Sequence, residues 1–424
     1  MSLKIAIIGA GSVYTPEIIE GLSENREKLP VTELTLMDIN EERLQIMFDF
    51  LNRYKKHHNL SFDIHKTTDL VEAVKGQDFV LTQIRVGGNK ARIHDEKIPL
   101  KYDVIGQETT GPGGYMKALR TIPAILKIAK AIEEHNPDAW LINYANPTGI
   151  LAEAVRNYAN IKFIALCAGG MRPRTWVDWA LGVNYKDVKY DFVGLNHMNF
   201  AYNIRVNGRA ITKEEFDKVA DIHETVSPEY IKAINALPSL YCQYYFQRDK
   251  KLAELKAQEK TRGEQVLSLE KEIYDALKNP EQSDKPEVLK SRGGGGYSEL
   301  ALEALSSIYN DEDMWIVANV KNERAIPFLP YDASVETPCV LNKNGITPLV
   351  QNNIPEGIYG LVAAVKNYES LVVKAAVEGD YEVALQAMVA HPLVGDFDKA
   401  KAMLDEMLLV NAEYIHPKLV EGLK

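Results

Sequence analysis

Residues 3–13 read Leu-Lys-Ile-Ala-Ile-Ile-Gly-Ala-Gly-Ser-Val, and this stretch decides the fold. The apolar run at 3–8 predicts a strand that is buried on both faces, and the glycines after it predict a tight turn. Thr15 and Pro16 then predict the start of a helix, with Thr15 as its cap. A strand, a glycine turn and a helix in this order are the context of a dinucleotide-binding fingerprint.

The expected cofactor contacts are Gly9, Gly11, Ser12, Val13 and Asp38. Glycines let backbone amides approach a pyrophosphate, and the N-terminus of the following helix favours negative charge. Asp38 follows the predicted second strand, where a carboxylate can accept hydrogen bonds from a ribose 2′-hydroxyl, which favours NAD over NADP. The third glycine of the usual fingerprint is absent, so a purely structural turn is the alternative.

Strand and helix patterns alternate through the first half of the chain. Strands are predicted at 33–37, 62–65, 79–82, 140–143 and 163–166, and helices at 40–54, at 118–132 and from Asn146-Pro147 onward. This alternation predicts an α/β fold, a Rossmann-like doubly wound parallel sheet with ligands at the carboxyl ends of its strands.

The second half predicts a mixed α+β, helix-rich domain. Paired strands are expected at 188–194 and 202–206, a charge-dense helix at 247–277, and long helices at 354–378 and 383–409. The four glycines at 293–296 predict a turn or a loop that closely approaches a ligand. We therefore expect an NAD-binding domain over residues 1–170 and a catalytic, substrate-binding and oligomerisation domain over residues 171–424.

Composition narrows the function classes. The 424 residues carry a net charge of −10, with 46% hydrophobic and 25% charged residues, as in an ordinary globular protein. The acidic excess argues against nucleic acid and anionic membranes as partners, but not against an anionic small molecule in a basic pocket. No apolar run is long enough to span a bilayer and no signal-peptide pattern is present. Three scattered cysteines predict free thiols in a cytoplasmic protein.

Residues 85–114 (RVGGNKARIHDEKIPLKYDVIGQETTGPGG) resemble glycoside hydrolase family 4, the NAD- and divalent-metal-dependent glycosidases. The likeness is greatest to the 6-phospho-β-glucosidase branch. Further segments similar to the family are NYANPTG at 143–149, GLNH at 194–197, YCQYYF at 241–246, SRGGGGYS at 291–298 and VETPC at 335–339. Several motifs in the family's order are far more specific than any one of them.

The resemblance implies the site residues. Cys167 and His197 match the family's metal ligands, with Mn²⁺ as the metal, although a lone cysteine or histidine more often fills a core. Tyr241 matches the tyrosine that removes a proton, and it needs a nearby cation because a phenol has a pKa of about 10.

Arg92, Asn146 and Arg292 are the candidate substrate ligands, including for a 6-phosphate, because guanidinium groups bind phosphate through two parallel hydrogen bonds. A surface ion pair is the alternative for either arginine. Glu108 and Thr109 are expected near the nicotinamide and the sugar.

The implied activity is hydrolysis of 6-phospho-β-glucosides. It proceeds by NAD-dependent oxidation at C3, metal-assisted removal of the C2 proton, loss of the aglycone, addition of water and re-reduction. The small-molecule partner is then a phosphorylated sugar. By analogy with lactate and malate dehydrogenases, whose architecture we expect here, the chain forms a homodimer or homotetramer.

One departure leaves alternatives open. Cys167-Ala168-Gly169-Gly170 stands where the phospho-glucosidases of the family have Cys-Asn/Asp-x-Pro, and Ala168 can neither contact a substrate through a polar group nor donate a proton. A family 4 glycosidase for an α-linked glucoside, a galactoside or a uronide, phosphorylated or not, is the first alternative. A net NAD-dependent dehydrogenase of the lactate or malate type is the second, and a noncatalytic sensor of sugar phosphates is the third.

Overall fold

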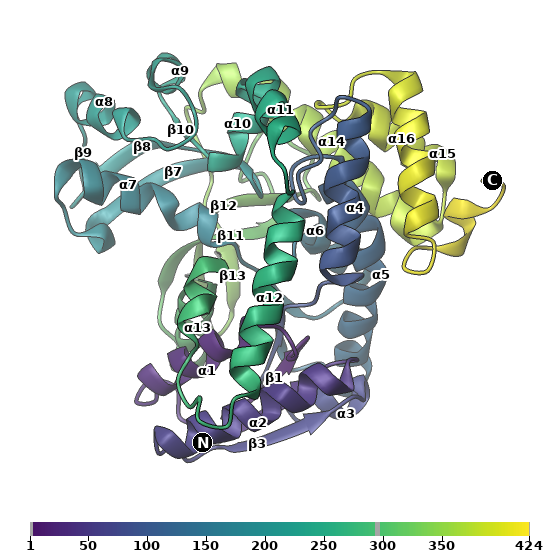
Figure 1. The fold of residues 1–424 in the computed structure, drawn as a ribbon. Helices are drawn as coiled ribbons and strands as arrows, with labels where there is room; N and C mark the ends of the chain where they lie inside the picture. Colours follow the sequence, from purple (N-terminus) through teal and green to yellow (C-terminus); the bar gives the residue numbers. More distant parts are fainter. Residues whose placement is uncertain (1–2, 293–296, 424) are drawn as a thin grey trace.

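The computed structural model describes residues 3–292 and 297–423, and a parallel sheet forms its centre. Six parallel strands lie in the order β3-β2-β1-β4-β5-β6 (Figure 1). Their bounds are β1 (Leu3–Ile8), β2 (Val31–Met37), β3 (Asp63–Thr67), β4 (Phe79–Thr82), β5 (Trp140–Asn143) and β6 (Lys162–Ala165). Every residue of β4 and β5 is buried, as their mostly apolar sequences favour, and the polar side chains of Thr82 and Asn143 at their ends bond to each other. The predicted Rossmann-like sheet is confirmed.

Helices connect these strands and cover both faces of the sheet. They are α1 (Thr15–Glu24), α2 (Glu41–His57), α3 (Leu70–Val74), α4 (Gly88–Lys101), α5 (Pro112–His135) and α6 (Thr148–Tyr158). Asn40 caps α2 by accepting a hydrogen bond from the Arg43 amide. The prediction that Thr15 caps α1 is wrong, because its hydroxyl donates instead to the Ala10 carbonyl, 2.8 Å away, and Tyr14 occupies the cap position.

Three strands from the second half extend the same sheet. β11 (Met314–Lys321), β12 (Ser334–Asn342) and β13 (Gly345–Pro348) add to it in antiparallel fashion, and Asn319 of β11 pairs with Ala165 of β6. The nine-stranded sheet therefore contains strands from both sides of residue 170. The division into domains 1–170 and 171–424 stays a prediction.

A second, antiparallel sheet lies beyond the carboxyl end of β6. The chain passes through η1 (Ala168–Met171), α7 (Arg172–Leu181) and η2 (Tyr185–Asp187) into this sheet. It consists of β7 (Val188–Leu195), β8 (Met198–Val206), β9 (Arg209–Ala210) and β10 (Leu237–Pro238). The predicted pairing of two strands here is confirmed. The turn between β7 and β8 contains only Asn196 and His197.

Helices make up most of the remaining chain. The second sheet is followed by α8 (Lys213–Asp221), α9 (Pro228–Ile234), η3 (Leu240–Cys242), α10 (Gln243–Phe246), α11 (Arg248–Ala257), α12 (Arg262–Lys278), η4 (Glu287–Arg292) and α13 (Tyr297–Asn310). The C-terminal group is η5 (Glu356–Ile358), α14 (Tyr359–Glu378), α15 (Tyr381–Ala390), α16 (Phe397–Val410) and η6 (Pro417–Val420). In Figure 1, α12 runs beside α4, and α15 and α16 lie at the right-hand edge of the molecule.

Two predicted helices are each divided in the structure. Residues 247–277 do not form one helix, because Thr261 caps α12 in a reciprocal pair of hydrogen bonds with Glu264. Residues 383–409 are divided because Pro392 disfavours helical geometry at the preceding residue and Asp396 caps α16. The loop predicted at residues 293–296 lies outside the described residues.

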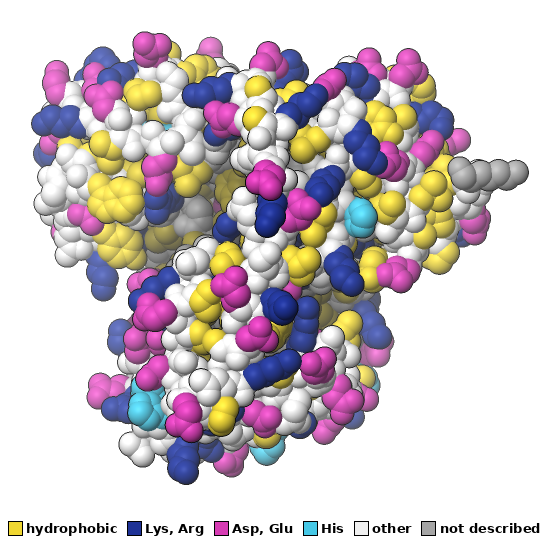
Figure 2. Space-filling model, viewed as in Figure 1, with side chains coloured by type: hydrophobic (Ala, Val, Ile, Leu, Met, Phe, Trp, Pro, Cys, Tyr) yellow, Lys and Arg dark blue, Asp and Glu magenta, His cyan; other side chains and the backbone are white. Residues whose placement is uncertain are grey.

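The surface is mixed in charge. On the face shown in Figure 2, acidic and basic side chains are interspersed and hydrophobic side chains are scattered among them. Across residues 3–292 and 297–423, none of the helices has the length and apolarity that a bilayer span requires.

Candidate active site

The carboxyl ends of the parallel strands meet at one edge of the sheet, as the topology requires. The glycine turn follows β1, Arg85 follows β4, Asn146 follows β5 and Cys167 follows β6. Segments that are far apart in the sequence therefore lie together at this edge. The candidate active site lies at the same edge.

The turn after β1 has the geometry of a nucleotide loop. Gly9 has φ of +86°, and a Cβ there would lie 3.1 Å from the Ile84 amide nitrogen. A Cβ on Gly11 would lie 2.8 Å from a carboxylate oxygen of Asp38, whose Oδ2 accepts the Gly11 amide at 2.9 Å. Both positions therefore require glycine, because other atoms of the chain fill the space that a Cβ would take.

The other predicted cofactor residues continue this turn. The Ser12 amide donates to the Gly9 carbonyl at 3.0 Å, and the Val13 side chain is buried in the core, so Val13 offers a ligand only its backbone. Asp38 also accepts the Asn40 amide through Oδ1. Tyr274 of α12 donates to the Gly11 carbonyl, which ties a helix of the second half to the nucleotide turn.

Cys167 and His197 lie together in the interior. Cys167 Sγ is 3.5 Å from His197 Nε2, and both side chains are buried. Bonds of about 2.3 Å from a metal to sulfur and about 2.1 Å to nitrogen would separate two such donors by about 3–4 Å at ordinary bond angles. The donor set and its spacing therefore fit one divalent cation.

Thr109 fixes the imidazole from its other side. Its hydroxyl lies 2.8 Å from His197 Nδ1. Burial lowers the pKa of His197 to about 3, with nearby Lys117 acting in the same direction. The ring is therefore neutral near pH 7, and a proton on Nδ1 directed at Thr109 leaves the Nε2 lone pair facing Cys167.

Tyr241, in η3, lies against the same imidazole. The two rings are stacked, with centroids 3.7 Å apart and planes 10° from parallel. Burial raises the pKa of the Tyr241 phenol, and the neighbouring Cys167 and Glu108 raise it further. A divalent cation held by Cys167 and His197 would act in the opposite direction, which is what a tyrosine base needs.

Glu108 is enclosed by cations. Its carboxylate accepts from Arg85 Nη1 at 2.6 Å and lies 3.0 Å from Arg92 Nη1 and 3.2 Å from Lys117 Nζ. Burial alone would raise the pKa of Glu108, but these three cations hold it well below its usual range. Burial lowers the pKa of Lys117 to about 7, and Arg85 contributes in the same direction.

Arg292 brings a further positive charge to this cluster. Its guanidinium carbon is 5.0 Å from the centre of the Tyr14 ring, and the charges of Arg85, Arg92 and Glu108 all influence its pKa, which burial lowers. Among the described residues, its buried Nε has no hydrogen-bond acceptor. A buried, cation-rich cluster with a guanidinium nitrogen to spare is suited to an anionic ligand.

The predicted substrate residues are not all placed alike. Arg92 donates from Nε to Glu96 Oε1 at 2.7 Å as well as pairing with Glu108, whereas Arg292 is linked to Glu108 only through an electrostatic influence on its pKa. Asn146 is half-buried beside the start of α6, where its Oδ1 accepts from the Thr148 hydroxyl at 3.2 Å. Its contact with substrate stays a prediction.

Sequence reasoning missed Arg85 and Lys117. Arg85 lies three residues after β4, and that position at a strand end was the available signal. Lys117 lies in the buried first half of α5, and a buried lysine there indicates a partner of opposite charge.

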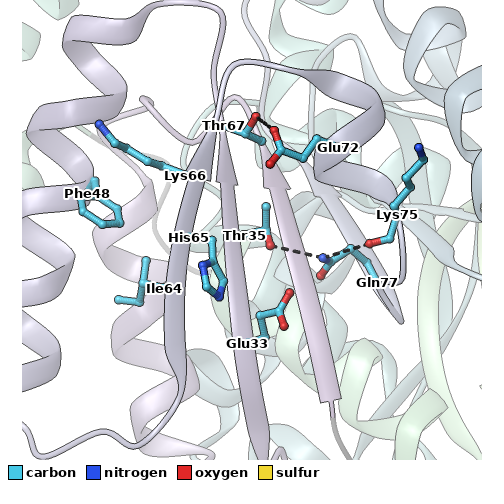
Figure 3. A pocket seen from close by; sticks show the side chains of 10 residues that line it. All are labelled: Glu33, Thr35, Phe48, Ile64, His65, Lys66, Thr67, Glu72, Lys75 and Gln77. Carbon is cyan, nitrogen blue, oxygen red and sulfur yellow. Dashed lines mark hydrogen bonds between the residues drawn. The ribbon is translucent and has the colours of Figure 1, made fainter.

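A cavity of 510 Å³ opens beside the metal-ligand candidates. Cys167, His197 and Tyr241 line it together with Ala168, and Arg172, Tyr185, Glu299 and Glu303 line it further out. Its size suits a sugar-sized ligand. A second hollow, of 420 Å³, lies over β2 and β3 and is lined by polar groups such as Glu33, His65 and Gln77 (Figure 3). None of the predicted site residues lines that hollow.

Comparison with known proteins decides the family. Residues 4–177 match the family described as "Family 4 glycosyl hydrolase", and residues 192–394 match its C-terminal domain. The chain is 42% identical to the "Probable 6-phospho-beta-glucosidase" of Bacillus subtilis (strain 168), over 97% of each chain. The chain belongs to the family 4 glycosyl hydrolases. It is therefore a glycosidase.

Solved structures agree with this assignment. The 6-phospho-β-glucosidase of Thermotoga maritima, solved with NAD and glucose-6-phosphate, is 32% identical, with a TM-score of 0.91 over 98% of this chain and 99% of that chain. The same protein was solved with manganese as well. Malate dehydrogenase of Plasmodium falciparum, 13% identical with a TM-score of 0.56 over 88% of this chain and 98% of that chain, shares the fold. The dehydrogenase-like architecture of this family 4 enzyme is thereby confirmed.

Proposed function

We propose that this family 4 enzyme hydrolyses 6-phospho-β-glucosides and uses NAD and Mn²⁺. The observation that carries the proposal is the placement of Cys167, His197 and Tyr241 on one cavity, with the Tyr241 ring stacked on the imidazole. The relatives support the substrate class, because the names of two of them refer to 6-phospho-β-glucosidases and one was solved with glucose-6-phosphate.

The chain offers a place for each cofactor. Cys167 Sγ and His197 Nε2 would hold the metal, and the backbone at Gly9, Gly11, Ser12 and Val13, with Asp38, would hold NAD. When bound, NAD exchanges a hydride with C3 of the sugar, and the cation stabilises negative charge that develops on substrate oxygens.

The side chains of the site would move and hold the protons. The Tyr241 phenolate oxygen takes the C2 proton, which the C3 ketone makes acidic, and the aglycone then leaves from C1. Thr109 keeps His197 oriented through Nδ1 during this step. Water adds at C1 before the ketone is reduced again, so no net oxidation occurs.

Arg92 and Arg292 would bind the 6-phosphate. They lie in the cationic cluster around Glu108, and Glu108 orients Arg92 by direct contact. Asn146 would contact the sugar from the loop after β5. Ala168, which lines the cavity directly after Cys167, cannot donate a proton, so we assign no acid to the leaving group.

The test is hydrolysis of 4-nitrophenyl β-glucoside 6-phosphate with Mn²⁺, NAD⁺ and a reductant. The unphosphorylated glucoside, the α-anomer, a galactoside and a uronide run in parallel, each with metal or NAD⁺ omitted. We expect turnover of the phosphorylated β-glucoside alone, dependent on both additives and without accumulation of NADH. Turnover of another sugar in its place would move the enzyme to the first alternative. Stoichiometric NADH would make it a dehydrogenase.

We also propose that the enzyme works in the cytoplasm as a homodimer or homotetramer. Among residues 3–292 and 297–423, Cys167, Cys242 and Cys339 are buried and form no disulfide, which suits a reducing compartment. The oligomer is proposed by analogy with the dehydrogenases that share the fold. Light scattering of the holoenzyme during gel filtration tests it, and a mass near 47.6 kDa would show a monomer instead.

A further inference from the structure

The turn that presents His197 has an unfavourable backbone. His197 adopts φ of +67° between the last residue of β7 and the first residue of β8. Positive φ is uncommon for residues other than glycine, but histidine adopts it more readily than most and a tight hairpin turn calls for it at a central position. The residues that flank His197 anchor this turn and so help to set where its imidazole lies.

Glu336 of β12 accepts hydrogen bonds from two of these flanking residues, Asn196 and Asn199. Its Oε1 accepts from the amide group of Asn196 at 3.3 Å, and its Oε2 accepts from that of Asn199 at 2.6 Å. Glu336 is fully buried, and no lysine or arginine forms an ion pair with it anywhere in residues 3–292 and 297–423. Amide groups on both sides of His197 are thus anchored to one carboxylate.

The same carboxylate is connected to the strand that leads to Cys167. Oε1 of Glu336 also accepts from Asn319 Nδ2 at 3.1 Å. Asn319 is the residue of β11 that pairs with Ala165, and its Nδ2 lies 3.4 Å from the Ala165 carbonyl. Ala165 ends β6, two residues before Cys167.

The helix after β5 closes the network. A Cβ on Gly149 of α6 would lie 3.1 Å from the Asn196 Cβ and 3.4 Å from the Asn319 Oδ1. Asn196 and Asn319 are therefore packed closely against the Gly149 backbone. Because of this close packing, a change in the position of Glu336 affects both the segment with His197 and the segment with Cys167.

We propose that Glu336 is a positioning residue that sets the separation between Cys167 and His197 and thereby the affinity of their site for a divalent cation. The inference rests on the proposed role of these two residues as metal ligands. Burial raises the pKa of Glu336 to about 7, and above that pH the ionised carboxylate only accepts hydrogen bonds and has room for three donors on two oxygens. A glutamine would replace one acceptor with a donor that faces an amide group.

The test measures binding of Mn²⁺ to Glu336→Gln in the absence of substrate. The electron paramagnetic resonance signal of free Mn²⁺ reports how much of the ion stays unbound. The control is Glu153→Gln, which also removes a buried carboxylate with three partners, namely Lys366, Ser370 and the Ser334 amide. We expect the Kd for Mn²⁺ to rise about tenfold or more in Glu336→Gln. In Glu153→Gln it stays within twofold, although Tm falls in both variants.

Further variants keep the inference falsifiable if Glu336→Gln does not fold. Asn199→Ala and Asn319→Ala each remove one donor to the carboxylate, and each is expected to raise the Kd for Mn²⁺ severalfold. Unchanged Mn²⁺ affinity in the folded variants overturns the role of Glu336.

Cys167→Ser separates this inference from the proposed function. Loss of Mn²⁺ binding in Cys167→Ser, together with wild-type affinity in Glu336→Gln, overturns the inference alone. Unchanged Mn²⁺ binding in Cys167→Ser overturns both the assignment of the metal ligands and the inference.

Discussion

His197 and Tyr241 share one ring contact, and the edge of the imidazole that carries Nε2 lies beside Cys167. The candidate base, Tyr241, is therefore in direct contact with the candidate metal ligand His197. A cation placed there would lie close to the phenol and would lower its pKa. A metal held by Cys167 and His197 would therefore also activate Tyr241 as a base.

Replacing Tyr241 with phenylalanine tests the base. The ring and its stacking remain but the phenol oxygen is lost, so we expect activity to fall by about 100-fold or more. Exchange of the C2 proton with solvent deuterium, measured by NMR, should fall with it, while NAD⁺ and Mn²⁺ still bind. Tyr244→Phe, which alters a neighbouring half-buried tyrosine, serves as the control. Unchanged exchange in Tyr241→Phe would reject this role.

Thr109→Val tests the orientation of the imidazole. The variant removes the hydroxyl at His197 Nδ1, and we expect the affinity for Mn²⁺ to fall by about 10–100-fold. Thr110→Val is a matched control, because the Thr110 hydroxyl is buried and has no hydrogen-bond partner among the described residues. Isothermal titration with Mn²⁺ compares the two. Equal affinities would show that Thr109 does not position His197.

Arg292→Gln tests recognition of the phosphate. We expect kcat/KM for the phosphorylated β-glucoside to fall by about 10-fold or more, because a charge-assisted hydrogen bond is worth about 1.5–3 kcal/mol. The Kd for NAD⁺ should change little. Arg248→Gln, which removes an exposed guanidinium paired with Asp249, is the control. A loss equal in both variants would point to general electrostatics instead of a phosphate contact.

Stability should depend on pH through His391. Its Nε2 lies 3.1 Å from the Thr110 carbonyl, and burial lowers the pKa of its imidazole to about 3. Below about pH 6.5 the unfolded chain takes up a proton that the native chain does not, so the free energy of unfolding falls as pH falls.

His391→Gln should therefore make the decline of Tm between about pH 6.5 and 4 less steep, as measured by calorimetry. The exposed His94→Gln is the control and should leave that slope unchanged. An unaltered slope in His391→Gln would show that His391 titrates alike in both states.

Local patterns in the sequence predict the parallel sheet well, because a fully apolar strand followed by glycine or a helix cap is a local signal. The joining of β11 to β6 was beyond such reasoning, since Asn319 and Ala165 are paired across 154 positions. The breaks within 247–277 and 383–409 did have local signals, namely the Thr261–Glu264 cap and Pro392.

The residues of the candidate site were likewise predicted only in part from the sequence. Family motifs named Cys167, His197 and Tyr241, and the structure brings these three together. Arg85 and Lys117 were missed because a buried cation is recognised by its partner, and the structure is needed to show that Glu108 contacts both.

The shared sheet also has a consequence for motion. Because β11–β13 return to the first sheet, a hinge at residue 170 would have to break the pairing of β6 with β11. The segment containing α10–α12 has no strand in either sheet and is held through side chains such as Tyr274 and Glu270. A motion that opened the site and kept this sheet intact would therefore have to displace these helices, with the two halves of the chain staying joined.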